Sequence, residues 1–149
     1  MIEGVRRVPL EWKLDDRGFL VQLFHLPDNL FPQIKRIYIV GNFSKGIIRG
    51  FHKHEYENKY FVVIQGTARF VLVSTDENNK PKQVDTYILS SKNPTILIVP
   101  PRVYNGWQSL EENTLLIGIS DKILEDSLSD DFRLDPFYFG RELWETKSR

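Results

Sequence analysis

The feature that most constrains the fold is a series of short apolar runs, rich in β-branched and aromatic residues and separated by polar turns. Seven such runs lie at Arg36–Val40, Ile47–Ile48, Tyr60–Ile64, Ala68–Val73, Thr86–Leu89, Thr95–Val99 and Thr114–Ile119. Two earlier segments, Val8–Trp12 and Phe19–Phe24, are predicted to add edge strands. Short strands at regular spacing are typical of an all-β sandwich or barrel.

The organisation of the chain is simple. Its 149 residues carry no internal repeat, low-complexity tract or linker, which predicts a single domain over residues 1–149. After the last strand, Leu124–Phe132 is predicted to form a short helical turn, and the aromatic tail that ends near Trp144 is predicted to pack back on the barrel. The acidic cluster Asp126–Asp131 is interpreted as a solvated surface.

Charge and composition exclude several classes of function. Twenty basic residues balance 20 acidic ones, so no net field attracts nucleic acid or an anionic membrane. The absence of cysteine excludes disulfides, thiolate metal sites and a thiol nucleophile. The N-terminus lacks the apolar core of a signal peptide, and no apolar run is long enough to span a bilayer. We therefore expect a cytoplasmic protein without a nucleic-acid or membrane partner.

The segment from Gly46 to Gly66 holds the densest group of chemically active residues. Its spacing, with His52 and His54, resembles the first cupin motif, in which two histidines and a glutamate bind a metal. Lys59 stands at the glutamate position. In Pro100–Asn105, which resembles the second cupin motif, Asn105 replaces the last histidine ligand. The resemblance implies a jelly-roll β-barrel of the cupin type. Because an ammonium group beside a divalent ion is unfavourable, we expect a pocket without metal or cofactor.

A wider resemblance covers nearly the whole chain. Five landmarks, in the right order, are similar to those of the dTDP-4-dehydrorhamnose 3,5-epimerase family: Asp15–Leu20, Asn42–His52, Lys59–Gly66, Val99–Leu110 and Asp135–Pro136. The family consists of metal-free cupin dimers that act on nucleotide-linked 4-keto-6-deoxy sugars in polysaccharide or deoxysugar biosynthesis. The resemblance thus implies a nucleotide-sugar substrate, and a homodimer in which the N-terminal segment crosses to the partner subunit.

The resemblance also assigns roles to single residues. His52 matches the base that removes the proton beside the sugar ketone, and Lys59 matches the lysine that stabilises the enolate. Arg49 matches an arginine that binds the pyrophosphate. A neutral imidazole has suitable basicity near pH 7, positive charge lowers the cost of an enolate, and an arginine fork suits phosphate. The other substrate-binding candidates are Arg17 (in the exchanged segment), Asn42, Arg102, Tyr104 and Asn105.

The geometry of this segment can be predicted only in part. His52 and His54 are two positions apart and share one face of a strand, which is either the pocket face or the solvent face. Arg49 is three positions from His52, so a regular strand would place the two on opposite faces. Gly50 between them predicts a bulge that brings both into one site. Tyr104 is either a substitute acid or a packed wall residue, and Arg102 either a phosphate ligand or a solvated loop residue.

Two departures from the family leave the reaction open. The family's catalytic tyrosine lies in the stretch equivalent to Ser120–Glu125, which has no tyrosine, and no aspartate follows Asp135 to orient the base. One alternative is a catalytically reduced cupin that binds a nucleotide sugar or carbohydrate without turning it over. Another alternative is a ketoisomerase. An Arg-Gly pair precedes His52 and His54 in the sequence, and this pattern partly resembles the 3,4-ketoisomerases of dTDP-4-keto-6-deoxyglucose. These enzymes use a histidine pair without the tyrosine, which makes His54 a further catalytic candidate.

Overall fold

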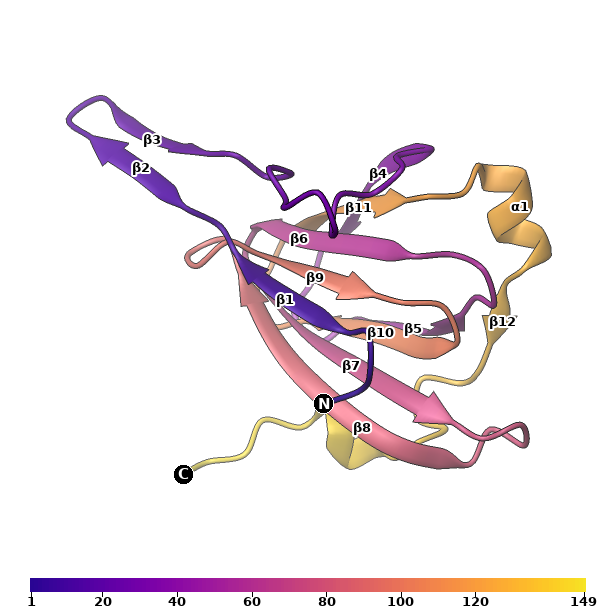
Figure 1. The fold of residues 1–149 in the computed structure, drawn as a ribbon. Helices are drawn as coiled ribbons and strands as arrows, with labels where there is room; N and C mark the ends of the chain where they lie inside the picture. Colours follow the sequence, from indigo (N-terminus) through magenta and orange to yellow (C-terminus); the bar gives the residue numbers. More distant parts are fainter.

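Two antiparallel five-stranded sheets pack face to face in the computed structural model, which describes residues 1–149 (Figure 1). The first sheet has the strand order β1 (Arg6–Pro9), β9 (Thr95–Val99), β6 (Lys59–Gln65), β11 (Thr114–Ser120) and β4 (Arg36–Asn42). The second has the order β12 (Phe132–Arg133), β5 (Ile48–Lys53), β10 (Val103–Ser109), β7 (Thr67–Thr75) and β8 (Pro81–Ser90). This arrangement confirms the predicted all-β jelly-roll.

Six of the seven predicted apolar runs lie wholly in strands, and Ile48 of the seventh is the first residue of β5, but the sequence missed the strand β10. Its sequence carries Asn105 and Gly106 at the centre, and both residue types are depleted in strands. Tertiary pairing overrides this preference, because β10 lies between β5 and β7 and hydrogen-bonds to both. The strand therefore contributes one wall of the barrel interior.

The core fills the space between the sheets. Alternate residues of the central strands point inward, including Phe61, Phe70, Leu97, Trp107 and Leu116. Phe61 and Phe70 approach with ring centroids 5.4 Å apart. Close packing of such aromatic and aliphatic side chains is the main source of stability in a barrel of this size.

The outer face of each sheet is covered by an irregular segment. Leu26 packs on Tyr60 and Val62 of the first sheet. On the second sheet, Trp144 lies 5.5 Å from Phe51 between ring centroids, and its indole nitrogen donates a hydrogen bond to the carbonyl of Pro136. This confirms that the aromatic tail packs back on the barrel.

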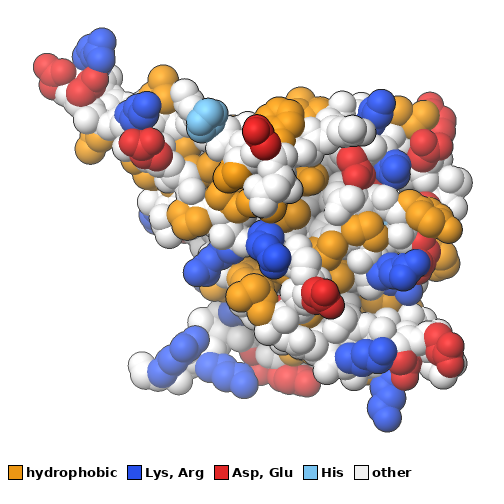
Figure 2. Space-filling model, viewed as in Figure 1, with side chains coloured by type: hydrophobic (Ala, Val, Ile, Leu, Met, Phe, Trp, Pro, Cys, Tyr) orange, Lys and Arg blue, Asp and Glu red, His pale blue; other side chains and the backbone are white.

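The N-terminal strands differ from the prediction. Only β1 joins the barrel, where it pairs with β9. The strands β2 (Trp12–Asp15) and β3 (Gly18–Val21) instead form a separate hairpin that projects from the body of the molecule (Figures 1 and 2). Leu14 and Phe19 on this hairpin are 78% and 68% exposed. The prediction of two edge strands in the barrel was therefore wrong for the second segment.

A short helix, α1 (Leu124–Ser129), confirms the helical turn predicted after the last strand of the barrel. A 3-10 helix, η1 (Arg141–Trp144), follows near the C-terminus. No helix of the chain has the length and apolar character needed to cross a membrane. In Figure 1, α1 lies at one end of the barrel, beside the strands β11 and β12.

Candidate active site

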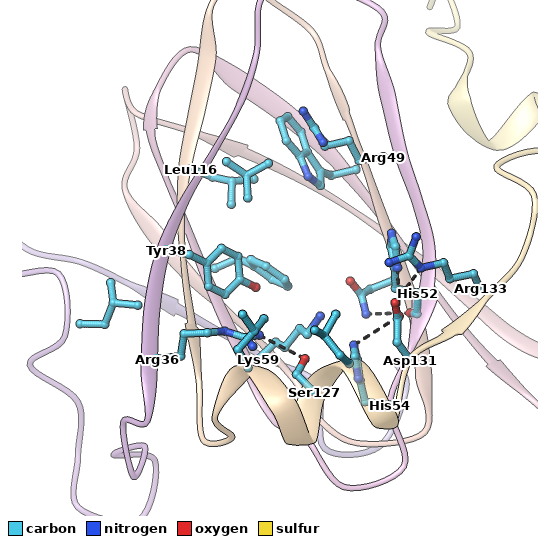
Figure 3. Close-up of a pocket in the computed structure, with 17 residues that line it drawn as sticks. Arg36, Tyr38, Arg49, His52, His54, Lys59, Leu116, Ser127, Asp131 and Arg133 are labelled. Atoms are coloured by element: carbon cyan, nitrogen blue, oxygen red, sulfur yellow. Dashed lines mark hydrogen bonds and ion pairs between the residues drawn. The ribbon is translucent and has the colours of Figure 1, made fainter.

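A cavity of about 500 Å³ opens between the two sheets beside α1 (Figure 3). Apolar residues such as Val40, Phe61, Trp107 and Leu116 form one part of its wall. Its polar residues are Arg36, Tyr38, Arg49, His52, His54, Lys59, Asn105, Ser127, Asp131 and Arg133. Four of them are basic, namely three arginines and Lys59, and one is a carboxylic acid, so basic side chains outnumber acidic ones in the lining although the chain is neutral overall.

The predicted bulge is present in β5. Asn105 of β10 lies opposite His52 and Trp107 lies opposite Arg49, so two residues of β5 face the single residue Gly106. The bulge turns both Arg49 and His52 toward the cavity. A Cβ atom on Gly50 would lie 2.7 Å from the Cα of Gly106, so this close approach requires glycine.

His52 is held by a carboxylate that the sequence analysis did not assign to the site. Its Nδ1 atom lies 3.2 Å from Oδ1 of Asp131. When Nδ1–H donates to the carboxylate, the lone pair of Nε2 is free to accept a proton. Burial lowers the pKa of His52 below its ordinary value of 6.5, although the hydrogen bond and charge of Asp131 act to raise it. The imidazole is therefore neutral at pH 7.

Asp131 corrects the interpretation of the acidic cluster as a solvated surface. Its side chain is only 12% exposed and lies in the cavity. Oδ2 accepts a hydrogen bond of 2.6 Å from Nε of Arg133. Burial acts to raise the pKa of Asp131, but the hydrogen bonds from Arg133 and His52 lower it overall, so the group stays ionised. Neighbouring Asp130 caps the backbone amides of Glu55 and Tyr56.

His54 also lies in the cavity lining, on the same side of the strand as His52, as predicted. It is almost fully buried, and burial and the charge of Lys59 lower its pKa. Glu57 lies behind it and pairs with Arg36 at 3.2 Å.

Lys59 extends into the cavity from the start of β6 (Figure 3). Burial lowers its pKa below the ordinary value of 10.5, while the charges of Glu57 and Asp131 act in the opposite direction. No carboxylate is paired with it directly. An ammonium group in this position can stabilise an oxyanion that forms on a bound molecule.

Arg49 is oriented by Asn42. Its Nε donates to Oδ1 of Asn42 at 2.8 Å, and its Nη2 donates to the carbonyl of Gly41 at 3.1 Å. Asn42 is buried and donates in turn to the carbonyl of Ile47 and to Ser109. It does not line the cavity, so the structure places Asn42 behind a ligand-facing residue instead of in the pocket itself.

Three predicted contact residues lie outside the cavity. Tyr104 points to the outer face of its strand, packs against Phe139 and donates to Asn79 at 2.9 Å, so it is a packed wall residue. Arg102 is exposed and pairs with Glu55 at 3.0 Å. Arg17 projects from the hairpin and contacts only Asp15 of its own chain.

Asn105 does face the cavity, as predicted. Its Nδ2 donates to the backbone carbonyl of His52 at 2.9 Å. The side chain thus ties β10 to the strand that carries the two histidines. With Lys59 and Asn105 in place of a carboxylate and an imidazole, the residues present do not form a set of divalent-metal ligands.

Comparison with known proteins places this chain in a family. Residues 1–131 match the family model described as dTDP-4-dehydrorhamnose 3,5-epimerase. The chain belongs to the dTDP-4-dehydrorhamnose 3,5-epimerase family. It is 33% identical over 121 residues to the spore coat polysaccharide biosynthesis protein SpsL of Bacillus subtilis. The aligned region covers 78% of each chain.

Solved structures share the fold of this epimerase-family chain. The RmlC epimerase of Mycobacterium tuberculosis superposes with a TM-score of 0.80 at 15% identity, over 97% of this chain and 74% of the other. QdtA, a sugar 3,4-ketoisomerase from Thermoanaerobacterium thermosaccharolyticum in complex with TDP, superposes with a TM-score of 0.74 at 22% identity, over 93% of each chain.

Tyr38 is a site residue that the sequence analysis missed. It lies in the cavity on β4, across from the histidines, and burial followed by the charge of Glu57 raises its pKa to about 12. The resemblance to the family predicts the catalytic tyrosine in Ser120–Glu125, on a different part of the chain. Strand parity was the available signal, because Arg36, Tyr38 and Val40 alternate with exposed residues and share the cavity face.

Proposed function

We propose that this chain is a metal-independent isomerase or epimerase of a nucleotide-linked 4-keto-6-deoxy sugar, with dTDP as the expected carrier. The observation that carries the proposal is the His52–Asp131 pair facing the same cavity as Lys59. In this reaction His52 removes a proton from the carbon beside the ketone. The electron pair moves into the bond to the carbonyl carbon, and the ammonium group of Lys59 stabilises the oxyanion that results.

The cationic lining supports a substrate that carries a diphosphate. Arg49 keeps Nη1 free because Asn42 and Gly41 occupy its other nitrogens. Arg133 lies on the same side of the cavity as His52. Guanidinium groups are well suited to phosphate oxygens, so we assign the diphosphate to Arg49 and the sugar to the end of the cavity that holds His52 and Lys59.

Tyr38 is the best-placed acid for the return of a proton. Its pKa of about 12 keeps the phenol protonated throughout the neutral range. It belongs to the opposite sheet from His52, so it faces a bound sugar from another side. Return of the proton to the same carbon from that side gives an epimer, and transfer to the adjacent carbon gives an isomer. We expect either product to enter polysaccharide or deoxysugar biosynthesis, and the chain to act in the cytoplasm.

The proposal is tested by incubating the protein with dTDP-4-keto-6-deoxyglucose in deuterated water and following the sugar by NMR. We expect deuterium at C3, one of the two carbons beside the ketone, and loss of that exchange in His52→Asn. A wild-type protein that exchanges no carbon of this or any other 4-keto sugar nucleotide would overturn the proposal.

The second candidate function is a binding module that has lost catalysis, motivated by the absence of tyrosine from Ser120–Glu125. It predicts that a dTDP-sugar binds without any proton exchange. It also predicts an affinity that is unchanged in His52→Ala, as measured by isothermal titration calorimetry. Binding together with exchange at C3 would exclude it.

We also propose a homodimer in which the β2–β3 hairpin crosses to the partner subunit. The hairpin exposes Leu14 and Phe19, and the outer face of the edge strand β4 exposes Ile37 and Ile39. Apolar hairpins and unpaired edge strands of this kind are usually covered. On this proposal Arg17, which is 85% exposed, reaches the nucleotide of the partner's site.

Sedimentation and light scattering test the dimer. We expect a dimer for the wild-type protein and a folded monomer for a Leu14→Lys, Phe19→Lys double variant. Arg17→Ala is expected to remain dimeric but to weaken nucleotide binding. A wild-type monomer at micromolar concentration would contradict the proposal.

A further inference from the structure

Glu57 is a fully buried carboxylate at the back of the cavity, and its neighbours come from four separate segments. Ser120 and Ser127 donate hydroxyl hydrogen bonds to it, and Nη2 of Arg36 donates at 3.2 Å. Its Oε2 lies 3.0 Å from Nδ1 of His54, whose side chain is 5% exposed. A buried carboxylate is stable only when donors replace its lost hydration, and here the donors fix its position firmly.

The contact with His54 selects one nitrogen of the ring. Nδ1 of His54 is sealed from solvent, and Glu57 is the acceptor within reach of it. The alignment falls short of a formed hydrogen bond, so Nδ1 of His54 has no hydrogen-bond partner although Oε2 of Glu57 lies beside it. Nε2 points toward the cavity side, with Oδ1 of Asp131 at 3.8 Å, beyond hydrogen-bond distance (Figure 3). A proton on Nδ1 would face the carboxylate of Glu57, and Nε2 would keep a free lone pair on the cavity side.

The two histidines are therefore arranged alike. His52 directs Nδ1 to Asp131, and His54 directs Nδ1 to Glu57. We propose that Glu57 is a positioning residue that fixes His54 as a second base, in a His54–Glu57 pair separate from His52–Asp131. The inference rests on the proposed function and narrows it to the transfer of a keto group between adjacent carbons.

A second base gives this isomerisation a complete proton balance. His52 takes the C3 proton, the C3–C4 double bond forms, and the ketone oxygen O4 takes a proton from Tyr38. His54 then removes the proton of the O3 hydroxyl, and the C3–O3 carbonyl forms. The electron pair of the C3–C4 double bond moves to C4, which takes up the proton held by His52. Finally His54 returns its proton to Tyr38. The product is the 3-keto, 4-hydroxy sugar, with no net oxidation.

NMR of the substrate-free protein tests the positioning directly. Two-bond proton–nitrogen spectra at pH 7.5 report which nitrogen of each neutral histidine carries the proton. We expect His54 to be protonated at Nδ1, and Glu57→Gln to shift its tautomer and lower its pKa while the His52 signals stay unchanged. Glu55→Gln is the matched control, because Glu55 pairs with Arg102 outside the cavity. Protonation of His54 at Nε2 in the wild type would overturn the proposal. This measurement uses the wild-type protein alone, so it does not depend on the folding of any variant.

Turnover of dTDP-4-keto-6-deoxyglucose in deuterated water tests the consequence. Glu57→Gln and His54→Asn are expected to retain exchange at C3 within about threefold, and to lose roughly 100-fold in formation of the 3-keto product. Equal loss of both readouts in Glu57→Gln would reduce Glu57 to a structural role and contradict the proposal. Exchange at C3 with no 3-keto product from the wild type would also contradict it, while leaving the proposed function intact. No exchange at all would instead remove the proposed function.

Discussion

Oδ1 of Asp131 lies 3.2 Å from Nδ1 of His52, although 79 positions separate the two residues along the chain. The contact depends on β12, whose Arg133 pairs with His52 of β5. This two-residue strand places the carboxylate behind the imidazole and leaves Nε2 free. The proposed base is therefore oriented by a residue that follows the helix α1.

Replacement of Asp131 by asparagine is expected to lower the rate of C3 exchange at least tenfold and to move the acid limb of its pH profile to lower pH. The base works in its neutral form, and the carboxylate acts to raise the pKa of His52, so loss of its charge lowers that pKa further. Initial rates measured at several pH values check both effects. Asp126→Asn on the exposed face of α1 is the control. An acid limb that moves to higher pH would contradict this account.

Lys59→Gln is expected to slow C3 exchange by roughly 100-fold, because an uncharged amide stabilises an enolate less than an ammonium group does. Burial lowers the pKa of Lys59 below 10.5, so the wild-type rate should fall at a correspondingly lower alkaline pH. That alkaline fall should be absent from the variant. Lys53→Gln is the control, since Lys53 lies over the ring of Tyr104 on the outer face. An unchanged rate in Lys59→Gln would exclude its role at the enolate.

Tyr38 can be tested without removing its hydroxyl. A Cβ atom on Gly118 would collide with the ring of Tyr38 and lie 2.7 Å from its oxygen, so Gly118→Ala should displace the ring. We expect this variant to lose product formation to a similar degree as Tyr38→Phe, roughly 100-fold. The double variant should be no slower than either single variant, because both act on one group. Independent, additive losses would argue against Tyr38 as the acid.

Gly50→Ala is expected to destabilise the protein by about 2–4 kcal/mol, because its Cβ has no space against Gly106. Urea unfolding measures the change. Gly46→Ala is a matched comparison: Gly46 also has a positive φ, but a Cβ there meets nothing within 4 Å, so only the backbone cost of about 1 kcal/mol should appear. Equal losses in the two variants would show that the close approach at Gly50 is unimportant.

The sequence predicts the strands of this fold well because their apolar periodicity is a local property. It also predicts the positions of His52, Lys59 and Arg49, because all three belong to one short segment whose spacing and glycine bulge are readable. Asp131 could not be found in this way. Its entry into the cavity depends on the pairing of β12 with β5. Because β12 is only two residues long, its sequence shows no recognisable strand pattern.

Tyr104 and Asn42 show the complementary limit. Both lie in segments that match the family, yet Tyr104 is turned to the outer face and Asn42 is buried behind Arg49. A motif identifies a segment, while the direction of each side chain is set by the register of its strand. In β10 that register places Asn105 inside and Tyr104 outside.

The packing of the C-terminal tail on the outer face has a consequence for the interior. Leu134 exchanges two backbone hydrogen bonds with Phe51, and Trp144 and Phe139 clamp the ring of Phe51 from outside. Phe51 is the immediate neighbour of His52, and Asp131 lies three positions before Leu134. The C-terminal segment therefore connects the packing on the outer face of the barrel to the His52–Asp131 pair in the cavity. Substitution of Trp144 or Phe139 on the outer face would therefore leave His52 less firmly positioned in the cavity, although neither aromatic residue contacts the substrate.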